Sequence, residues 1–347
     1  MSFAIVSLGF KCFGKRQRVR RPARKAGWRP FARAALVLLL AASSHQAWAE
    51  YPDRIVKLVV PFPPGGGTDV IARTLAQEMT ENLGVTVVVT NKPGAGTIIG
   101  TEAVATSDPD GYTLLMGTFA NAVNPSLHAK LPYDPHRDFA SVALIARSFN
   151  IVVVDPKSPI KSIADLIAAA KADPGKLSYG TYGIGSSAHL AGELFQNMAK
   201  VSLTTIHYKG AAPAITDQIS GQIQVMFTTV ASAASLIESG QLRALAVTSA
   251  ERSPAFPQLP TVAEAGVPGY AAESWYGLLA PAKTPASVVA RLNQSAAKAV
   301  QSEAFKKLGV NEGLVMVAQP PEALDRYLRG EEDRWRKVIQ QAGIKVE

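Results

Sequence analysis

Cysteine is nearly absent from this chain of 347 residues, which contains only Cys12. That position lies in a basic leader, so a processed chain would contain no thiol. Such a chain can form no disulfide, thiolate nucleophile or cysteine-ligated metal site. We therefore expect stability to come from packing, for which a composition of 47% hydrophobic residues is ample.

Acidic residues are absent from the first 49 positions, which hold ten of the 36 Lys and Arg residues. The rest of the chain has 26 basic and 27 acidic residues, so the formal net charge of +9 belongs to the leader. A strongly basic protein would suggest binding to nucleic acid or to an anionic surface. Without the leader that suggestion disappears, and we expect no nucleic-acid partner.

Long hydrophobic runs are also missing. The apolar run at residues 34–42 has nine residues, whereas a transmembrane helix needs about 20. It follows the basic stretch and precedes Ala47-Trp48-Ala49, an A-x-A cleavage pattern. We predict a signal peptide at 1–49 that is cleaved after Ala49, and export to the periplasm. A retained anchor and a twin-arginine signal at Arg20-Arg21 are the alternatives.

The remaining sequence alternates between strand-like and helix-like segments, which predicts α/β architecture with parallel sheets and helices on both faces. Two sheets, in two lobes that face each other, fit the pattern better than one very long sheet. The predicted strands are 55–60, 85–89, 112–116, 151–154, 177–181, 204–207, 222–227, 242–249 and 275–281. The predicted helices are 68–83, 97–106, 162–172, 188–198, 213–219, 285–301 and 320–341.

A glycine-rich loop at residues 63–69 lies between the first strand and the first helix. Glycines let the backbone turn tightly, so that successive N–H groups converge, and the helix N-terminus adds partial positive charge. A carboxylate suits such a site; the alternative is a plain turn in which Thr68 caps the helix. The ligand-binding residues predicted here are Pro64, Gly65, Gly66, Gly67, Thr68 and Asp69.

Two later loops repeat this arrangement in the second half. Residues 183–189 offer Ser186, Ser187 and His189 as donors at the start of a helix. The alternative is a serine N-cap beside a solvent-exposed histidine. Residues 209–213 place Gly210 and Ala211 where their small size permits close approach of a ligand, and Lys209 beside them is an ordinary surface charge in the alternative interpretation.

Motifs for other chemistries are missing. The mature chain has no G-x-S-x-G, H-E-x-x-H or G-x-x-x-x-G-K-[ST] motif, and its histidines lack metal-ligand spacing. Residues 94–100 read G-x-G-x-x-x-G after the second strand, which differs from the dinucleotide fingerprint in spacing and place. We predict no metal, no cofactor and no enzymatic activity. A Ser-His-Asp arrangement assembled only in space stays open as an alternative.

An ordered set of motifs runs from residue 51 to near the end of the chain. The motifs are YP at 51–52, VPFPPGGGTD at 60–69, AR at 72–73, NKPGAG at 91–96, PDGYTL at 109–114, LPYDP at 131–135, DF at 138–139, YKG at 208–210, LAVT at 245–248, PTVAEAG at 260–266 and WYGL at 275–278. With these motifs the chain resembles the periplasmic substrate-binding proteins of tripartite tricarboxylate transporters, the TctC or Bug family.

The resemblance implies a type II periplasmic-binding-protein fold. One lobe would comprise residues 50–151 plus 272–347, and the other residues 152–271. The family's carboxylate-holding loop corresponds to residues 63–69, although Pro64 stands where Ala is frequent and Gly67 where Ser is common. The segment from Thr118 to Asn121, together with Ser186 and Ser187, corresponds to the part that closes the pocket.

The resemblance also implies a function. The protein would be a monomer that captures a small organic acid or amino acid in the periplasm and delivers it to a transporter with one large and one small membrane subunit. A ligand sensor that feeds a membrane kinase is the alternative, and an exported hydrolase using Ser187 and His189 is a second one.

Overall fold

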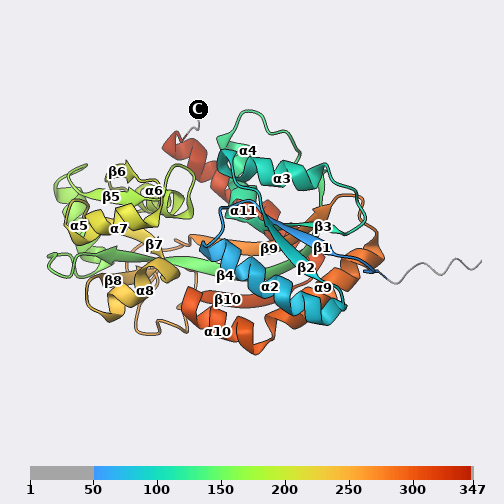
Figure 1. Cartoon of the computed structure of the whole chain (residues 1–347). Helices are drawn as coiled ribbons and strands as arrows, with labels where there is room; N and C mark the ends of the chain where they lie inside the picture. Colours follow the sequence, from blue (N-terminus) through green and yellow to red (C-terminus); the bar gives the residue numbers. More distant parts are fainter. Residues whose placement is uncertain (1–50, 345–347) are drawn as a thin grey trace, which may run out of the picture. The chain divides into compact units, whose positions relative to one another are not determined.

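The computed structural model describes residues 51–344. The predicted signal peptide and its cleavage site at Ala49 lie outside these residues. The longest strand, β4 (Phe139–Val154), joins two sheets. Its first part pairs with β9 (Glu273–Pro281) and β10 (Leu314–Gln319), and its last five residues pair with β7 (Val225–Thr229). This strand therefore connects the two halves of the fold (Figure 1).

The first sheet has the order β2-β1-β3-β9-β4, with β10 on the other side of β4. Strands β1 (Val56–Val60), β2 (Val87–Asn91) and β3 (Thr113–Thr118) are mutually parallel. The pairs β3–β9, β9–β4 and β4–β10 are antiparallel. The carboxyl ends of the parallel strands β1 and β3 lie on the same side of this sheet, and a helix begins after each of them.

The second sheet repeats this design. Strands β5 (Ser178–Thr181), β6 (Thr204–His207) and β7 are parallel, whereas β7 and β8 (Arg243–Val247) pair antiparallel to β4. In each sheet, the strands that alternate with helices along the chain are parallel to one another, whereas the pairs that include β4 or β9 are antiparallel.

Helices cover both faces of both sheets. On the first sheet, α2, α9 and α10 pack on one face and α3, α4 and α11 on the other. On the second, α5 and α6 lie on one face and α7 and α8 on the other. Their bounds are α2 Gly67–Leu83, α3 Ile98–Ala105, α4 Phe119–Leu127, α5 Ile163–Ala172, α6 Ser187–Ala199, α7 Ala211–Ile219, α8 Val230–Glu238, α9 Ala286–Val300, α10 Glu303–Glu312 and α11 Pro321–Ala342.

The end of β4 shows why a continuous apolar run forms a strand here. Val152 and Val154 belong to one hydrophobic cluster, and Ile151 and Val153 to the cluster on the opposite face. All four side chains are completely buried. Because strand side chains alternate between faces, a run of β-branched residues is the signature of a strand covered on both sides.

The predicted α/β, two-lobed fold of the periplasmic-binding-protein type is confirmed by this architecture and by the solved structures reported below. Several elements were not predicted, namely α4, α8, α10 and β10, together with the first twelve residues of β4. The boundary predicted at 151/152 falls within β4, close to the point where its partners change, and the one at 271/272 falls just before β9. The lobe boundaries themselves stay a prediction.

Candidate functional site

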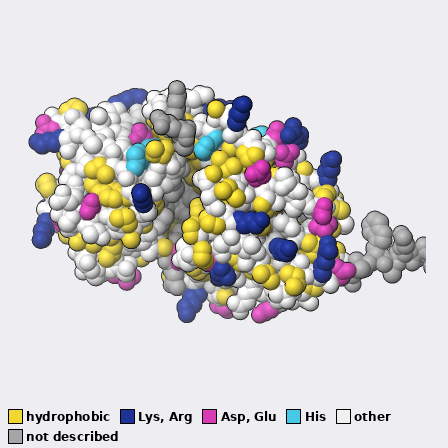
Figure 2. Space-filling model, turned by 45° about the horizontal axis from the view of Figure 1, so that its top comes forward, with side chains coloured by type: hydrophobic (Ala, Val, Ile, Leu, Met, Phe, Trp, Pro, Cys, Tyr) yellow, Lys and Arg dark blue, Asp and Glu magenta, His cyan; other side chains and the backbone are white. Residues whose placement is uncertain are grey.

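A cavity of about 930 Å³ opens where the helices of both sheets begin. Figure 2 shows a groove along the middle of the face that it draws. The cavity wall combines hydroxyl, glycine and apolar residues: Phe62, Gly67, Thr68, Ala95, Gly96, Thr97, Ile98, Thr118, Phe119, Ala120, Asn124, Leu127, His128, Ser148, Tyr182, Ile184, Gly185, Ser186, Ser187, Thr229, Ala231, Ser232, Ser274, Tyr276, Glu312 and Leu314.

Four helix N-termini contribute to this wall, each following a parallel strand. Helix α2 follows β1, α4 follows β3, α6 follows β5 and α8 follows β7. The carboxyl ends of parallel strands are the usual ligand-binding edge of an open α/β sheet. The first N–H groups of each helix lack intrahelical partners, so they give this edge partial positive charge.

Among the described wall residues, the one basic side chain is that of His128. Among the lining residues that the structure describes, none is lysine or arginine. In the same part of the chain, the backbone N–H groups of Gly67, Thr68 and Ser187 donate no hydrogen bond. An anion in the cavity would therefore be met by backbone N–H groups and hydroxyls rather than by side-chain cations.

Asp69 holds the first loop in shape. Its Oδ2 accepts hydrogen bonds from the backbone N–H of Gly65 at 2.9 Å and from Nε of Arg73 at 2.8 Å. Its Oδ1 accepts one from Nδ2 of Asn91 at 2.8 Å. These donors, Arg73 first, lower the pKa of Asp69 to about 2. The carboxylate is thus charged at neutral pH, and it bonds to its own loop rather than lining the cavity.

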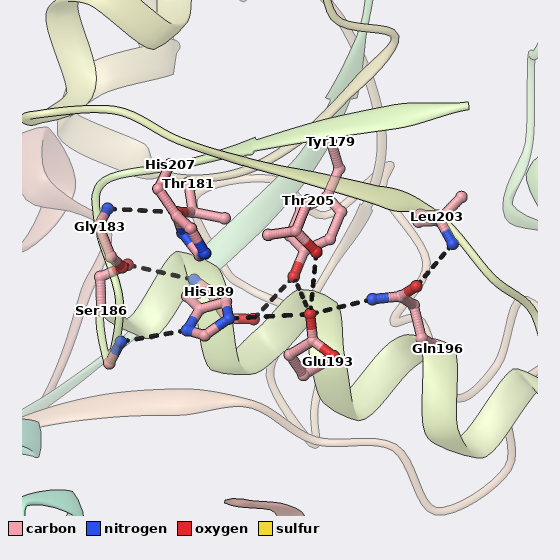
Figure 3. A network of polar contacts seen from close by, with 11 residues as sticks. Tyr179, Thr181, Gly183, Ser186, His189, Glu193, Gln196, Leu203, Thr205 and His207 are labelled. Carbon is pink, nitrogen blue, oxygen red and sulfur yellow. Dashed lines mark hydrogen bonds and ion pairs between the residues drawn. The ribbon is translucent and has the colours of Figure 1, made fainter. Parts of the chain in front are cut away.

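His189 holds the second loop in the same way. Its Nδ1 accepts the backbone N–H of Gly185 at 3.1 Å, and its own N–H donates to Oγ of Ser186 at 3.2 Å (Figure 3). Ser186 in turn donates its hydroxyl proton to the carbonyl of Gly183 at 2.8 Å. The alternative interpretation of the sequence, in which His189 is exposed to solvent, is wrong, because only 4% of His189 is exposed.

A buried polar network lies on the Nε2 side of the His189 ring (Figure 3). Oε1 of Glu193 accepts hydrogen bonds from Tyr179 at 2.6 Å and from Thr205 at 3.1 Å, and lies 3.8 Å from Nε2 of His189. Burial first, and the neighbouring His207 second, lower the pKa of His189 to about 4. The imidazole is therefore neutral at pH 7, with its proton on Nε2, because Nδ1 accepts a hydrogen bond.

Thr118 contributes a side-chain hydroxyl to the cavity wall. Its backbone N–H donates to Oδ1 of Asn121 at 2.8 Å, which caps α4. Its side-chain Oγ1 is buried in the cavity wall, where it faces the backbone N–H of Asn121 in a capping box, but no described group meets it with the geometry of a hydrogen bond. A buried hydroxyl without a partner costs free energy of about 1–3 kcal/mol, so a ligand that bonds to it would remove that cost.

The structure divides the predicted ligand-binding residues into two groups. Five of them line the cavity: Gly67, Thr68, Thr118, Ser186 and Ser187. The others are not part of its wall: Pro64, Gly65, Gly66, Asp69, Asn121, His189, Gly210 and Ala211. Two of the second group, Asn121 and His189, hold backbone that does line it, and Asp69 holds Gly65 in the loop that precedes the wall residues Gly67 and Thr68.

Several wall residues were not predicted. Tyr182 directly follows β5 and Thr229 is the last residue of β7, so their place at the carboxyl ends of strands could have been used to find them. Tyr276 on β9 and Glu312 at the end of α10 come from elements far along the chain. These two residues reach the wall through the tertiary arrangement of the two sheets, and no local sequence motif predicts that arrangement.

Within residues 51–344, no helix is both long enough and apolar enough to cross a membrane. No group of three or more potential metal ligands was found in the same part of the chain.

Comparison with known proteins gives one consistent result. The profile of the tripartite tricarboxylate transporter family receptors (TctC) matches residues 71–344. The structure of R. palustris Rpa4515 with adipate shares 38% sequence identity, covers 86% of this chain and 100% of its own, and superposes with a TM-score of 0.77. Periplasmic binding protein BugD shares 36% identity, with 85% and 100% coverage and a TM-score of 0.74.

A third solved structure, MatC (Rpa3494) from Rhodopseudomonas palustris with bound malate, shares 30% identity. It covers 83% of this chain and 100% of its own, with a TM-score of 0.73. The resemblance seen in the sequence motifs is thereby confirmed. The matching family consists of transporter receptors, which agrees with the prediction that the chain is not an enzyme.

Proposed function

The chain belongs to the tripartite tricarboxylate transporter receptor family, and from this we propose that it captures a small carboxylate in the cavity between its two sheets. The observation that carries the proposal is the cavity wall. It combines four helix N-termini with hydroxyl side chains and lacks lysine and arginine among the described residues. Adipate and malate, the ligands in two of the similar structures, are both carboxylates.

Binding would rest on fixed N–H groups. Each hydrogen bond from such a group to a carboxylate is worth about 1.5–3 kcal/mol because one partner is charged. The loops that carry these groups are already held by Asp69 and His189. Little ordering is therefore required when the anion arrives, which favours affinity.

Transport is the second part of the proposal. The protein would act in the periplasm as a monomer and deliver its ligand to a membrane transporter with one large and one small integral subunit. Membership of a family of transporter receptors and the similarity to the periplasmic binding protein BugD support this role. A receptor that signals to a membrane kinase would use the same cavity. Loss of uptake on deleting the gene, with signalling intact, distinguishes transport from that role.

The carboxylate site can be tested with matched pairs of ligands. Calorimetry with dialysed protein should detect binding of at least one acid among hexanoate, adipate, malate and 6-aminohexanoate. Hexanamide, which has the shape of hexanoate without its charge, should bind at least about tenfold more weakly than hexanoate, equal to about 1.4 kcal/mol. Binding of the amide as tight as the acid, or no binding of any acid, would contradict the proposal.

A further inference from the structure

The last residue of α10, Glu312, brings a carboxylate into a cavity that is otherwise built for anions. Among the lining residues in the described part of the chain, it is the only Asp, Glu, Lys or Arg. Its side chain is partly buried, and burial raises the pKa of the carboxyl group. No described side chain donates a hydrogen bond to this carboxylate, and no described cation forms an ion pair with it.

The Glu312 carboxylate lies beside the N-terminus of α2. A side-chain carbon placed on Gly67 would be 3.4 Å from Oε2 of Glu312. On the other side, the carboxylate is close enough to Tyr276 to contribute, after burial, to raising the pKa of that phenol to about 12. Gly67, Tyr276 and Glu312 are therefore neighbours in one part of the cavity wall, which we call the acidic part.

An anion-attracting group outside this part of the wall comes from another helix. Ser187, at the start of α6, lines the cavity with a backbone N–H that donates no hydrogen bond, whereas Thr118 pairs directly with Tyr276 across β3 and β9. A ligand with two carboxylates would have to place one of them near Glu312 or leave part of the cavity to water. Two like charges in a partly desolvated site repel each other strongly. A group that donates hydrogen bonds would instead be attracted there.

We propose that Glu312 is a specificity-determining residue, which selects solutes that carry a carboxylate at one end and an ammonium group at the other. The carboxylate would bond to the N-terminus of α6, and the ammonium group would bond to Oε2 of Glu312. This inference rests on the proposed carboxylate-binding function and adds the chemistry of the ligand's second end. It makes the ligand an amino acid rather than a dicarboxylic acid.

Three ligands of matched chain length test this assignment: hexanoate, adipate and 6-aminohexanoate. They share a carboxylate and differ at the other end, which is a methyl group, a carboxylate or an ammonium group. Calorimetry on the wild-type protein should give at least about tenfold tighter binding for 6-aminohexanoate than for adipate. In the Glu312→Gln variant, which keeps the shape of the side chain, 6-aminohexanoate should bind about tenfold more weakly and adipate more tightly.

Glu303→Gln provides the matched control, because Glu303 is in the first turn of the same helix and pairs with Lys306 outside the cavity. It should leave all three affinities unchanged. If hexanoate binds but Glu312→Gln leaves the ratio between 6-aminohexanoate and adipate unaltered, the role of Glu312 is wrong and the carboxylate function stands. If none of the acids binds the wild-type protein, both proposals fail.

Discussion

Nδ1 of His189 accepts the backbone N–H of Gly185 at 3.1 Å. The same relationship recurs in the other half of the fold, where Oδ2 of Asp69 accepts the backbone N–H of Gly65 at 2.9 Å. In both loops the acceptor lies four residues after a glycine with positive φ, 76° for Gly185 and 87° for Gly65. Both binding loops are therefore held in shape by a side chain that itself stays outside the cavity.

Replacing His189 with Ala should weaken ligand binding without removing any group from the cavity wall. The Gly185 N–H would lose its acceptor, and the loop that carries Ser186 and Ser187 would become more mobile. One lost hydrogen bond of about 1–1.5 kcal/mol corresponds to about five- to tenfold weaker binding. Calorimetry gives the affinity, and faster hydrogen exchange at Gly185 would show the loosened loop. Full affinity with faster exchange would mean that the loop does not hold the ligand.

Asp69 should make stability depend on pH in the acid range. Its folded-state pKa of about 2 lies below the ordinary value of 3.8, so the charged form is favoured by folding. The resulting stabilisation is complete above about pH 4 and is lost as the pH falls through about 2. In urea unfolding, Asp69→Asn should be less stable than the wild type at pH 7. The difference should shrink progressively between pH 4 and pH 2. A constant difference would show that its charge is not what holds the loop.

Thr118→Val should separate stability from binding. The change keeps the shape of the side chain but removes a buried hydroxyl that has no partner among the described residues. The change also removes the Thr118 contact that caps α4, and these two effects oppose each other. The unliganded protein should therefore stay within about 1 kcal/mol of the wild type, while affinity for the carboxylate falls about five- to tenfold.

Thr101→Val is the matched control for this change. The Thr101 hydroxyl is also buried, but it donates to the carbonyl of Thr97 at 3.0 Å and does not line the cavity. Its loss should lower stability by about 1 kcal/mol and leave the affinity unchanged. Lower stability of Thr118→Val with unaltered affinity would contradict a role for Thr118 in binding.

Local sequence signals predicted the parts of the site that depend on neighbours along the chain. The strand-to-helix loops at residues 63–69 and 183–189 could be found because glycine, hydroxyl residues and a change of hydrophobic period coincide there. Thr68, Ser186 and Ser187 were predicted on these grounds, and all three lie in the cavity wall.

The sequence could not show which side chains turn away from the cavity. Asp69 and His189 bear the groups most suited to chemistry, yet both bond to the loops that precede them. A side-chain acceptor four residues after a glycine can point into the cavity or bond to its own loop, and the packing of the whole fold determines which of the two occurs. Glu312 and Tyr276 were missed for another reason: α10 and β9 reach the cavity through the tertiary arrangement.

The last prediction concerns catalysis, for which Ser186 and His189 were the pair that the sequence left open. In the structure the Ser186 hydroxyl donates to the carbonyl of Gly183, and its oxygen accepts the backbone N–H of His189. The imidazole Nδ1 is occupied by the Gly185 N–H, and Nε2 faces Glu193. No base is therefore in position to take the serine proton. Hexanoate, adipate and 6-aminohexanoate incubated with the protein should be recovered unchanged by NMR after a day. Conversion of any of them by the wild type, absent in both Ser186→Ala and His189→Ala, would show an enzyme.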